Sequence, residues 1–436
     1  MARHHKHYTK STEHTGSYYA ASANSQSQRP ALTGDHRFDI CVVGAGYSGL
    51  STALHLAEAG YQVAIVEGAR IGWGASGRNG GQIVNGLNAS LQTIERRYGK
   101  DTASFVASLV MEGGDIIRER IERYSIDCDL KPTNIFTAYT PAHVAELEER
   151  LALWRGYGIE TQEMLDQDQI RNYIGTDAYV GGMIDHSGGH MHPLNLALGE
   201  AEAFESHGGV IFENSFVSHV DFEASNPVVK TADGSISCNK LVLCGNAYLG
   251  KVVAKLTSRV MPVSTQIIAT EPLSPELAQQ LLPTDSCVED VRYILDYFRL
   301  SADKRLLFGG GTVYSGNDPR DIEARLRSNM ERVFPALNNT RVDFAWSGNF
   351  ALSFSRVPQL GRLNDNTYFA HGYSGHGVTG SHTFGRILSE AINGDLTRFD
   401  VFEKVPWIPF PGGRMFRVPY STVGSWYYSL RDRIGL

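Results

Sequence analysis

The stretch FDICVVGAGYSG, residues 38–49, joins a short apolar run to the pattern G-x-G-x-x-G. The apolar run over 38–43 predicts a buried parallel strand, because it shows no polar alternation and ends at a glycine. Apolar residues then recur at helical spacing over 48–59, and Gly60 ends that helix. A second apolar run at 62–66 predicts another strand. The sequence therefore predicts a βαβ unit within a Rossmann-like, doubly wound parallel sheet.

Each glycine of this pattern has a physical role in holding a dinucleotide. Gly44 permits the tight turn, Gly46 lets backbone N–H groups approach a pyrophosphate, and Gly49 allows the helix to pack closely on the strand. The helix N-terminus at Ser48 adds partial positive charge for the phosphates. Glu67, at the end of the second strand, is placed to accept hydrogen bonds from the ribose hydroxyls. An incidental glycine turn is the alternative to dinucleotide binding.

The segment that follows favours FAD over NAD as the dinucleotide. It reads RIGWGASGRNGGQ over residues 70–82 and contains five glycines. Such a segment lets the backbone run close against a flat ring or a phosphate. Arg78 within it is suited to pair with a phosphate or with a surface carboxylate. A flexible glycine loop that holds no ligand is the alternative.

Length, charge and cysteine content set the class of protein. A chain of 436 residues is too long for one hydrophobic core, because single cores stop growing near about 250–300 residues. The formal charge of −7 argues against nucleic acid as a partner, since binding it needs a basic face. The five cysteines include no Cys-x-x-Cys pair, so neither a disulfide framework nor a metal site is predicted. No run of about 18 apolar residues occurs, and we expect a cytoplasmic protein without a membrane partner.

The chain is predicted to form two interleaved domains. The first is an α/β domain that contains the parallel sheet and is predicted to bind FAD. The second is an α+β domain whose segments of alternating polar and apolar residues indicate an antiparallel sheet, which is predicted to form the floor of the substrate pocket. A flexible arm precedes the two domains, and an aromatic tail follows them. We expect the tail to pack on the body, with a lid or an interface as the alternatives. The ranges are 1–35 for the arm, 36–115, 181–262 and 343–405 for the FAD domain, 116–180 and 263–342 for the substrate domain, and 406–436 for the tail.

Several motifs resemble the superfamily of FAD-dependent amine and D-amino-acid oxidases, and within it the branch that acts on gamma-glutamylated polyamines. The likeness covers nearly the whole chain and rests on EHTGSYYAASAN at 13–24, SGRNGG at 76–81, DHSGGHMHPLNLA at 185–197, GNAYLG at 245–250, HGYSGHGVT at 371–379 and FPGGR at 410–414. It implies oxidation of the primary amine of gamma-glutamylputrescine, or of a related gamma-glutamylated polyamine, to the aldehyde with release of ammonia and hydrogen peroxide.

The resemblance also implies where FAD is held. Backbone at Val217 meets the adenine, residues 245–247 lie near the flavin phosphates, and residues 375–378 lie beside the flavin ring. Non-covalent FAD is expected, because Cys287 is the last cysteine and no histidine lies between residues 55 and 143. The residues predicted to bind FAD are Gly44, Gly46, Tyr47, Ser48, Gly49, Glu67, Gly68, Arg70, Ser76, Gly77, Arg78, Asn79, Gly80, Gly81, Gln82, Val217, Gly245, Asn246, Gly375, His376, Gly377, Val378 and Thr379.

Two departures from related oxidases narrow the substrate. Relatives that oxidise amino acids place an arginine just after a Trp-x-Gly-like turn, and some place another in the late glycine motif, to hold the substrate carboxylate. Here the two turns read WSGNF at 346–350 and SGH at 374–376, without arginine. A plain amine is therefore favoured over an α-amino acid. Arg356 is suited to hold a distant carboxylate such as the glutamyl end, with a structural ion pair as the alternative.

Oxidation requires the neutral amine, because an ammonium nitrogen has no lone pair to stabilise the developing iminium. A free aliphatic amine has a pKa of about 10.4, so the pocket must desolvate it, and aromatic walls are suited to this. Core packing is the alternative for each aromatic candidate, and a hydrogen bond to the flavin is the alternative for His376. The candidates are Tyr293, Tyr297, Phe298, Phe350, Phe354 and Tyr373. The predicted catalytic set is His376, Tyr293 and Tyr373, and the predicted substrate contacts are Phe350, Arg356 and Tyr297.

Three functions are compatible with the sequence. The first is an amine oxidase that uses a small amine and oxygen. The second is an oxidase or dehydrogenase of sarcosine, glycine or a D-amino acid, which the missing arginines disfavour. The third is a flavin-binding scaffold without enzymatic activity. We expect a monomer or a small homo-oligomer.

Overall fold

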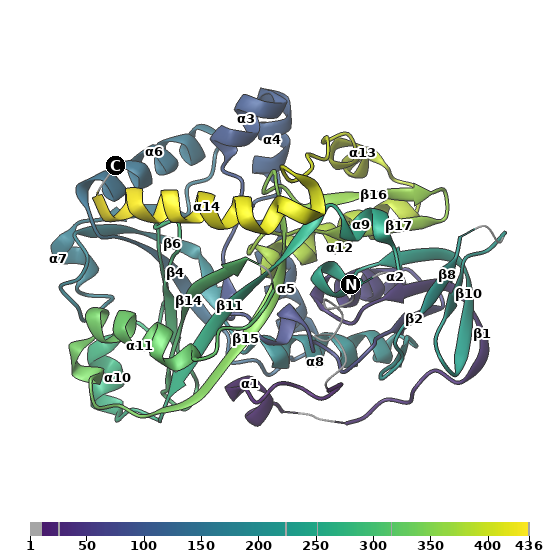
Figure 1. Ribbon diagram of the computed structural model, residues 1–436, viewed down its shortest axis with the longest axis horizontal. Coiled ribbons are helices and arrows are strands. Elements are labelled where there is room, and N and C mark those ends of the chain that lie inside the picture. The colour runs from purple at the N-terminus through teal and green to yellow at the C-terminus, as the bar shows by residue number, and fades with distance from the viewer. Residues whose placement is uncertain (1–10, 25–26, 223–224, 251, 315, 435–436) are drawn as a thin grey trace.

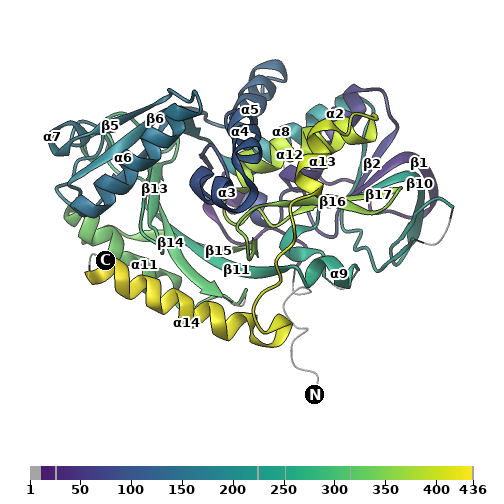
Figure 2. The same cartoon turned by 90° about the horizontal axis from the view of Figure 1, so that it is seen from above.

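The computed structural model contains two sheets that lie side by side and are connected by helices (Figure 1, Figure 2). Side chains at 414, 428, 429 and 431–434 are not described. The structure describes residues 11–24, 27–222, 225–250, 252–314 and 316–434.

The first sheet is the parallel sheet predicted from the glycine motif. Strands β17, β10, β1, β2 and β7 run parallel, and β16 joins the edge antiparallel to β17. The hairpin of β8 and β9 extends β10. In sheet order the bounds are β16 (Gln359–Asn364), β17 (Thr367–His371), β10 (Gly234–Leu243), β1 (Gly34–Val43), β2 (Val63–Val66) and β7 (Val210–Phe212), with β8 (His219–Asp221) and β9 (Val228–Lys230) beside them.

Both faces of this sheet are covered, which explains the continuous apolar run in β1. Ile40 and Val42 pack into the cluster formed with helices α2 (Tyr47–Glu58), α8 (Pro193–Ser206) and α12 (Gly377–Ile392). Cys41 and Val43 point to the other face, where residues of the β8–β9 hairpin cover them. Successive strand residues face opposite sides, so a strand buried on both sides must be apolar throughout.

The second sheet is mixed rather than purely antiparallel. Strand β12 pairs parallel with β4, whereas the other neighbours pair antiparallel. In sheet order the bounds are β15 (Val342–Ser353), β11 (Val260–Thr270), β14 (Leu306–Tyr314), β13 (Tyr297–Leu300), β12 (Cys287–Asp290), β4 (Lys131–Ala138), β6 (Gly181–His190) and β3 (Gln82–Ile83), with β5 (Gln162–Leu165) on β6.

Three predicted domain boundaries differ from the sheet assignment. Residues 181–190 form β6 and residues 342–353 form β15, both in the second sheet, although we placed them largely in the FAD domain. The two residues of β3 also pair with β6. These strands pair with strands that are distant in the sequence. The local pattern of polar and apolar residues therefore does not indicate which sheet they join.

The remaining helices surround the two sheets. Among the described residues, no helix is long and apolar enough to cross a membrane. Their bounds are α1 (Tyr18–Ala21), α3 (Leu91–Tyr98), α4 (Lys100–Ser108), α5 (Glu112–Arg123), α6 (Pro141–Gly156), α7 (Gln167–Ile170), α9 (Ala254–Thr257), α10 (Pro275–Leu281), α11 (Ile322–Val333), α13 (Thr397–Glu403) and α14 (Gly413–Ile434), with short turns η1 (Ala75–Gly77), η2 (Asn246–Tyr248) and η3 (Pro335–Leu337).

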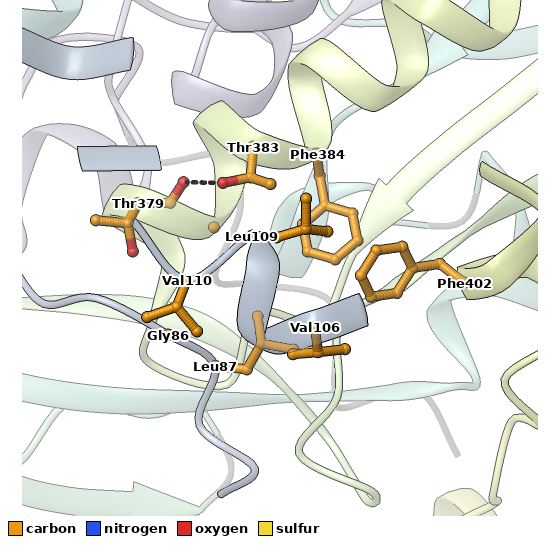
Figure 3. Close-up of a pocket in the computed structure, with 10 residues that line it drawn as sticks. Gly86, Leu87, Val106, Leu109, Val110, Thr379, Thr383, Phe384 and Phe402 are labelled. Atoms are coloured by element: carbon orange, nitrogen blue, oxygen red, sulfur yellow. Dashed lines mark hydrogen bonds between the residues drawn. The ribbon is translucent and has the colours of Figure 1, made fainter. Parts of the chain in front are cut away.

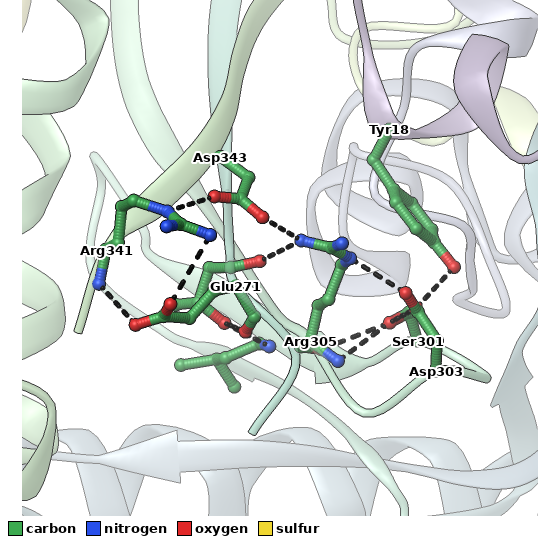
Figure 4. A network of polar contacts seen from close by, with 9 residues as sticks. Tyr18, Glu271, Ser301, Asp303, Arg305, Arg341 and Asp343 are labelled. Carbon is green, nitrogen blue, oxygen red and sulfur yellow. Dashed lines mark hydrogen bonds and ion pairs between the residues drawn. The ribbon is translucent and has the colours of Figure 1, made fainter. Parts of the chain in front are cut away.

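The predicted flexible arm is wrong for residues 11–24, which pack on the body. Tyr19 is fully buried, with its ring centroid 5.2 Å from that of Trp346. The Tyr18 hydroxyl donates to Asp303 at 2.7 Å, at one end of a polar network that continues through Arg305 to Asp343 (Figure 4). The buried aromatic side chains hold this segment on the body. Its polar composition had led us to predict a flexible arm. Residues 1–10 of the arm lie outside the described residues.

The aromatic tail forms α14, which lies along the second domain (Figure 1). Its inner side packs through Val418 against Met261 and Val263, and Arg417 donates to the Val260 carbonyl at 2.7 Å. Packing against the body, one of the predicted roles, is therefore what the described tail shows. Its outer side exposes large apolar side chains, namely Met415, Phe416, Tyr420, Val423, Trp426, Tyr427 and Leu430.

Candidate active site

The glycine motif closes the turn between β1 and α2 as predicted. Gly44 adopts a φ of +107°, which favours glycine. A Cβ on Gly49 would lie 1.9 Å from the Gly44 carbonyl oxygen, so only glycine permits this approach of helix to strand. The N-cap of α2 is Gly46, which has no side chain to form a cap hydrogen bond, and of the N–H groups in its first turn the one of Tyr47 is bound by Ser76 Oγ. The N-terminus of α2 thus retains the partial positive charge that suits a pyrophosphate.

Glu67 lies beside this helix end. Its carboxylate accepts hydrogen bonds from the backbone N–H groups of Ala45, at 2.7 Å, and Ala69, at 2.9 Å. Burial raises the pKa of Glu67, and these backbone hydrogen bonds act in the opposite direction. Each carboxylate oxygen can accept further hydrogen bonds, so the arrangement fits a ribose at the end of β2. A helix N-terminus that begins at glycine and lies next to a fixed carboxylate is the arrangement that a dinucleotide requires.

Val217, predicted to meet the adenine, and Gly68, predicted to bind FAD, lie close to this carboxylate. Gly68 adjoins Phe216, because a Cβ on Gly68 would lie 3.3 Å from that ring. Val217 is buried, whereas Phe216 exposes 58% of its surface. An exposed aromatic ring beside the ribose position offers a flat apolar surface that sequence reasoning did not identify.

The two arginines of the glycine-rich segment have protein partners. Arg70 Nη1 lies 3.4 Å from a Glu213 carboxylate oxygen, so Arg70 has an ion pair within the protein, and its contact with FAD stays a prediction. Arg78 stacks on Trp73, with its guanidinium carbon 4.5 Å from the ring centroid, and donates to the Trp73 carbonyl at 2.7 Å. Burial lowers the pKa of Arg78. Stacking, rather than a surface carboxylate, holds this guanidinium.

The rest of that segment connects the two sheets. Asn79 donates to the carbonyls of Ala75 and Ser76 and accepts from the Gly81 N–H at 2.8 Å. Arg299 of β13 donates to the Gly80 carbonyl at 2.6 Å. Ser76 Oγ accepts from Tyr47 N–H at 3.0 Å. The segment is therefore fixed both to the helix N-terminus and to the second sheet.

Gly80 and Gln82 of this segment also pack against the second sheet, whereas Gly77 packs within the segment. A Cβ on Gly80 would lie 2.7 Å from the Tyr297 ring, and one on Gly77 would lie 2.4 Å from the Gly72 oxygen. Gln82 donates to the Val288 carbonyl at 3.2 Å. Close backbone packing explains these glycines without reference to a ligand.

The late glycine motif forms the turn before α12 and adjoins the first motif. Gly372 N–H donates to Asn246 Oδ1 at 3.0 Å, which joins this turn to the predicted segment at 245–247. Gly375 adopts a φ of +103° with no atom within 4 Å of its Cβ position. Thr379 donates to the Val84 carbonyl at 2.7 Å. The structure thus brings three segments that we predicted to bind FAD into one region.

His376 forms the N-cap position of α12, and its ring lies 3.4 Å from the Asn88 amide nitrogen. Burial and the charge of Arg150 lower the pKa of His376 to about 4. The imidazole is therefore neutral at neutral pH. A neutral ring at a helix N-terminus is suited to hydrogen bonding and not to donating a proton as an imidazolium.

The predicted catalytic and substrate residues divide into two groups. Tyr373 is buried with its hydroxyl 2.6 Å from Ser48 Oγ, a contact that favours a structural role, and its place in the catalytic set stays a prediction. Phe298 is likewise a core residue, stacked on Phe308. Tyr293 is partly exposed and accepts from Arg356 at 3.3 Å. The other candidates lie on the second sheet or beside it, namely Tyr297 on β13, Phe350 on β15 and Phe354 next to Phe410.

Two charged residues that sequence reasoning missed lie near this region. Glu289 is on β12, in register with Tyr297 and with Phe136 of β4. The guanidinium of Arg150, from α6, lies 4.1 Å from the centroid of the Phe136 ring. Residues in register share a face of the sheet, so Arg150 and Glu289 lie on the same face. Only their separation of more than a hundred residues along the chain hid this pair.

A small apolar pocket lies between α4 and α12 (Figure 3). Its volume of 20 Å³ is about that of one water molecule, so it is too small for a flavin or an amine substrate. In the described part of the chain, no group of three metal-ligating side chains is present. All five cysteines are buried and free.

Comparison with known proteins gives concordant results. A family model described as FAD dependent oxidoreductase matches residues 39–391. The chain is 51% identical over 426 residues to a gamma-glutamylputrescine oxidoreductase of Escherichia coli (strain K12), covering 98% of this chain and 100% of that protein. It is 40% identical to a probable oxidoreductase of Haemophilus influenzae, covering 97% and 98%. The crystal structure of glycine oxidase from Geobacillus kaustophilus is similar with a TM-score of 0.71, at 22% identity, covering 85% of this chain and 100% of that chain.

Proposed function

Since the chain belongs to the family of FAD-dependent oxidoreductases, we propose that it oxidises the terminal primary amine of gamma-glutamylputrescine, or of a related gamma-glutamylated polyamine. The amine, water and oxygen give the aldehyde, ammonia and hydrogen peroxide. The observation that carries the proposal is the 51% identity to the Escherichia coli gamma-glutamylputrescine oxidoreductase over the full length of that protein.

The superfamily predicted from the sequence motifs is confirmed by the family model, and the α/β fold class by the two sheets and the solved relative. The chain is thus an FAD-dependent oxidoreductase, which removes the non-enzymatic scaffold from the three functions. The site also supports an amine over an amino acid. Asn349 stands where relatives that oxidise amino acids have an arginine; it lies within β15 and not in a turn, and it donates to the Gly316 carbonyl at 3.1 Å.

FAD, when bound, supplies the two-electron oxidation, and the protein binds and orients the reactants. The N-terminus of α2 would hold the pyrophosphate, Glu67 the ribose, and the start of α12 the flavin ring. Tyr297 and Tyr293 would form apolar walls that favour the neutral amine, since removal of water disfavours an ammonium ion. His376, neutral at neutral pH, would act as a hydrogen-bond partner.

We propose that the FAD is held without a covalent bond. Burial raises the pKa values of the Cys128 and Cys244 thiols to about 12, so the reactive thiolates are not populated. Acid precipitation of the purified holoenzyme should leave the flavin in the supernatant. Flavin that stays with the precipitated protein would contradict this proposal.

We also propose the electron acceptor of the reaction and the cellular location of the protein. Oxygen is the proposed acceptor, and peroxide formation in air with none under nitrogen tests it. A cytoplasmic location is supported by five free cysteines, as expected in a reducing compartment. Fractionation of cells that express the chain would check the location.

The decisive test of the proposed function is peroxide release by purified holoenzyme. Gamma-glutamylputrescine is compared with putrescine, sarcosine, glycine and D-alanine at equal concentrations. We expect the highest kcat/KM for the glutamylated amine. Preference for glycine, sarcosine or D-alanine would overturn the proposal in favour of an amino-acid oxidase.

A further inference from the structure

Arg150 is a partly buried guanidinium without a carboxylate partner among the described residues. It lies over two aromatic rings, 4.1 Å from the Phe136 centroid and 5.0 Å from the Trp154 centroid. The ion pairs within 4.0 Å and the hydrogen bonds of the described residues do not include its side chain. A partly desolvated charge that lacks a partner is costly, and burial accordingly lowers the pKa of Arg150. This guanidinium is therefore available to an anion.

Glu289 has the opposite charge on the same face of the second sheet. Its strand partner Phe136 carries the ring that Arg150 covers, and its other partner, Tyr297, packs against Gly80 of the glycine-rich segment. Burial raises the pKa of Glu289 to about 7, and the charge of Arg150 opposes this rise. The two side chains thus influence one another, yet they are more than 4.0 Å apart and form no ion pair.

We propose that Arg150 and Glu289 form a receptor for the free amino-acid end of the substrate's glutamyl group. The α-carboxylate binds the Arg150 guanidinium, and the α-ammonium binds the Glu289 carboxylate. In a gamma-glutamyl amide the α-carboxylate and the α-ammonium group are bonded to the same carbon. This matches the Arg150 guanidinium and the Glu289 carboxylate, which lie on one face of the sheet without pairing with each other. The inference rests on the proposed function and assigns the part of the substrate that the protein recognises.

The receptor adjoins the region that we assign to the flavin. His376, at the start of α12, feels the charge of Arg150, and Tyr297 connects Glu289 to the glycine-rich segment. A substrate anchored by its glutamyl end at Arg150 and Glu289 would therefore extend its amine toward the reacting centre. Arg356, which we predicted for the distant carboxylate, already donates to the Tyr293 hydroxyl. Arg150 is the better assignment because the described residues give it no polar partner.

Substrate analogues test the receptor in the wild-type holoenzyme. One analogue, N-(4-aminobutyl)glutaramic acid, lacks the α-amino group, and the other, N-(4-aminobutyl)-4-aminobutanamide, lacks the α-carboxylate. Each should lose about 10- to 100-fold in kcat/KM relative to gamma-glutamylputrescine, as expected for one charged hydrogen-bonded contact. Equal turnover of all three compounds would overturn the inference without affecting the proposed reaction.

Matched substitutions identify the residues. Arg150→Met should lower kcat/KM about 10- to 100-fold for gamma-glutamylputrescine and for the analogue without the amino group, but little for the analogue without the carboxylate. Glu289→Gln should give the reverse pattern. The controls are Arg155→Met and Glu149→Gln on exposed positions of α6, which should leave all three values unchanged. Losses that are equal for every compound would indicate a purely structural role and would overturn the inference.

Binding without turnover separates the two proposals. N5-butylglutamine retains the amino-acid end but lacks the amine to be oxidised, and its affinity for the holoenzyme is measured by calorimetry. We expect binding to the wild type that weakens about 10-fold or more in Arg150→Met. Absence of binding to the wild type would overturn the receptor even if gamma-glutamylputrescine is oxidised. Binding without any oxidation of gamma-glutamylputrescine would support the receptor and overturn the proposed function.

Discussion

The hydroxyl oxygen of Tyr373 lies 2.6 Å from Ser48 Oγ in the interior of the protein. This contact joins the late glycine motif to the first turn of α2, so it connects two of the segments that we assign to FAD. Burial raises the pKa of Tyr373 well above its usual range, and the hydroxyl stays protonated at neutral pH. Tyr373 is placed to hold the site in shape and not to exchange protons.

Tyr373→Phe should therefore reduce stability and leave catalysis nearly intact. We expect the free energy of unfolding to fall by about 1–3 kcal/mol, because the Ser48 hydroxyl loses its buried partner. The kcat of the FAD-loaded variant should stay within about twofold of the wild type. Urea unfolding and steady-state kinetics check the two values, with the exposed Tyr420→Phe as control. A large fall in kcat at unchanged FAD content would instead support the predicted place of Tyr373 in the catalytic set.

Gly49→Ala should abolish FAD binding. The added Cβ would lie 1.9 Å from the Gly44 carbonyl oxygen, and the helix must then move away from the strand and from the pyrophosphate position. The flavin absorbance per chain after gel filtration measures the effect. Gly424→Ala is the matched control, since no atom lies within 4 Å of its Cβ position. Normal FAD content in Gly49→Ala would show that the close approach is not required.

The βαβ unit was predictable because its signals are local. The apolar run, the glycines and Glu67 all lie within one short stretch, and the helix and strands formed close to the expected residues. Each of these residues is also required for one main physical reason. Gly49, for example, must be glycine because any side chain there would collide with the Gly44 carbonyl oxygen. The general position of the late glycine motif followed from the family resemblance and not from the residues alone.

The proposed receptor of Arg150 and Glu289 and the strand order of the second sheet could not be predicted from local signals of this kind. Arg150 reads as an ordinary charge on an amphipathic helix, and Glu289 reads as a polar residue in a short strand. Their proximity depends on the parallel pairing of β12 with β4, which joins residues far apart in the chain. The packing of Tyr19 was hidden for the same reason, because its partner Trp346 is distant in sequence.

Tyr19→Ala tests whether the N-terminal segment is part of the folded body. Tyr19 is fully buried, and its hydroxyl accepts from Arg299 at 3.1 Å. Loss of a buried aromatic side chain should lower the free energy of unfolding by about 3–5 kcal/mol. Chemical unfolding measures this loss beside Phe416→Ala, an exposed aromatic that should change stability by less than about 0.5 kcal/mol. Equal effects of the two substitutions would mean that the segment is not packed in solution.

Glu289→Gln should make the protein more stable at alkaline pH while it impairs substrate binding. Burial raises the pKa of Glu289 from 4.5 to about 7. A carboxyl group whose pKa rises on folding binds its proton more tightly in the folded protein. Its contribution to stability is therefore fully present below about pH 4.5 and is lost as the pH rises through about 7.

Glutamine stays neutral and avoids this loss. The variant should exceed the wild type by about 1–2 kcal/mol in the free energy of unfolding at pH 8, less than the whole shift implies because the side chain is partly solvated. The difference should close as the pH falls toward 4.5, which denaturant unfolding at a series of pH values measures. Glu149→Gln, at an exposed position, should show no such trend. A variant that is less stable than the wild type at pH 8 would mean that a charged Glu289 is stabilised in the folded protein by contacts stronger than that with Arg150.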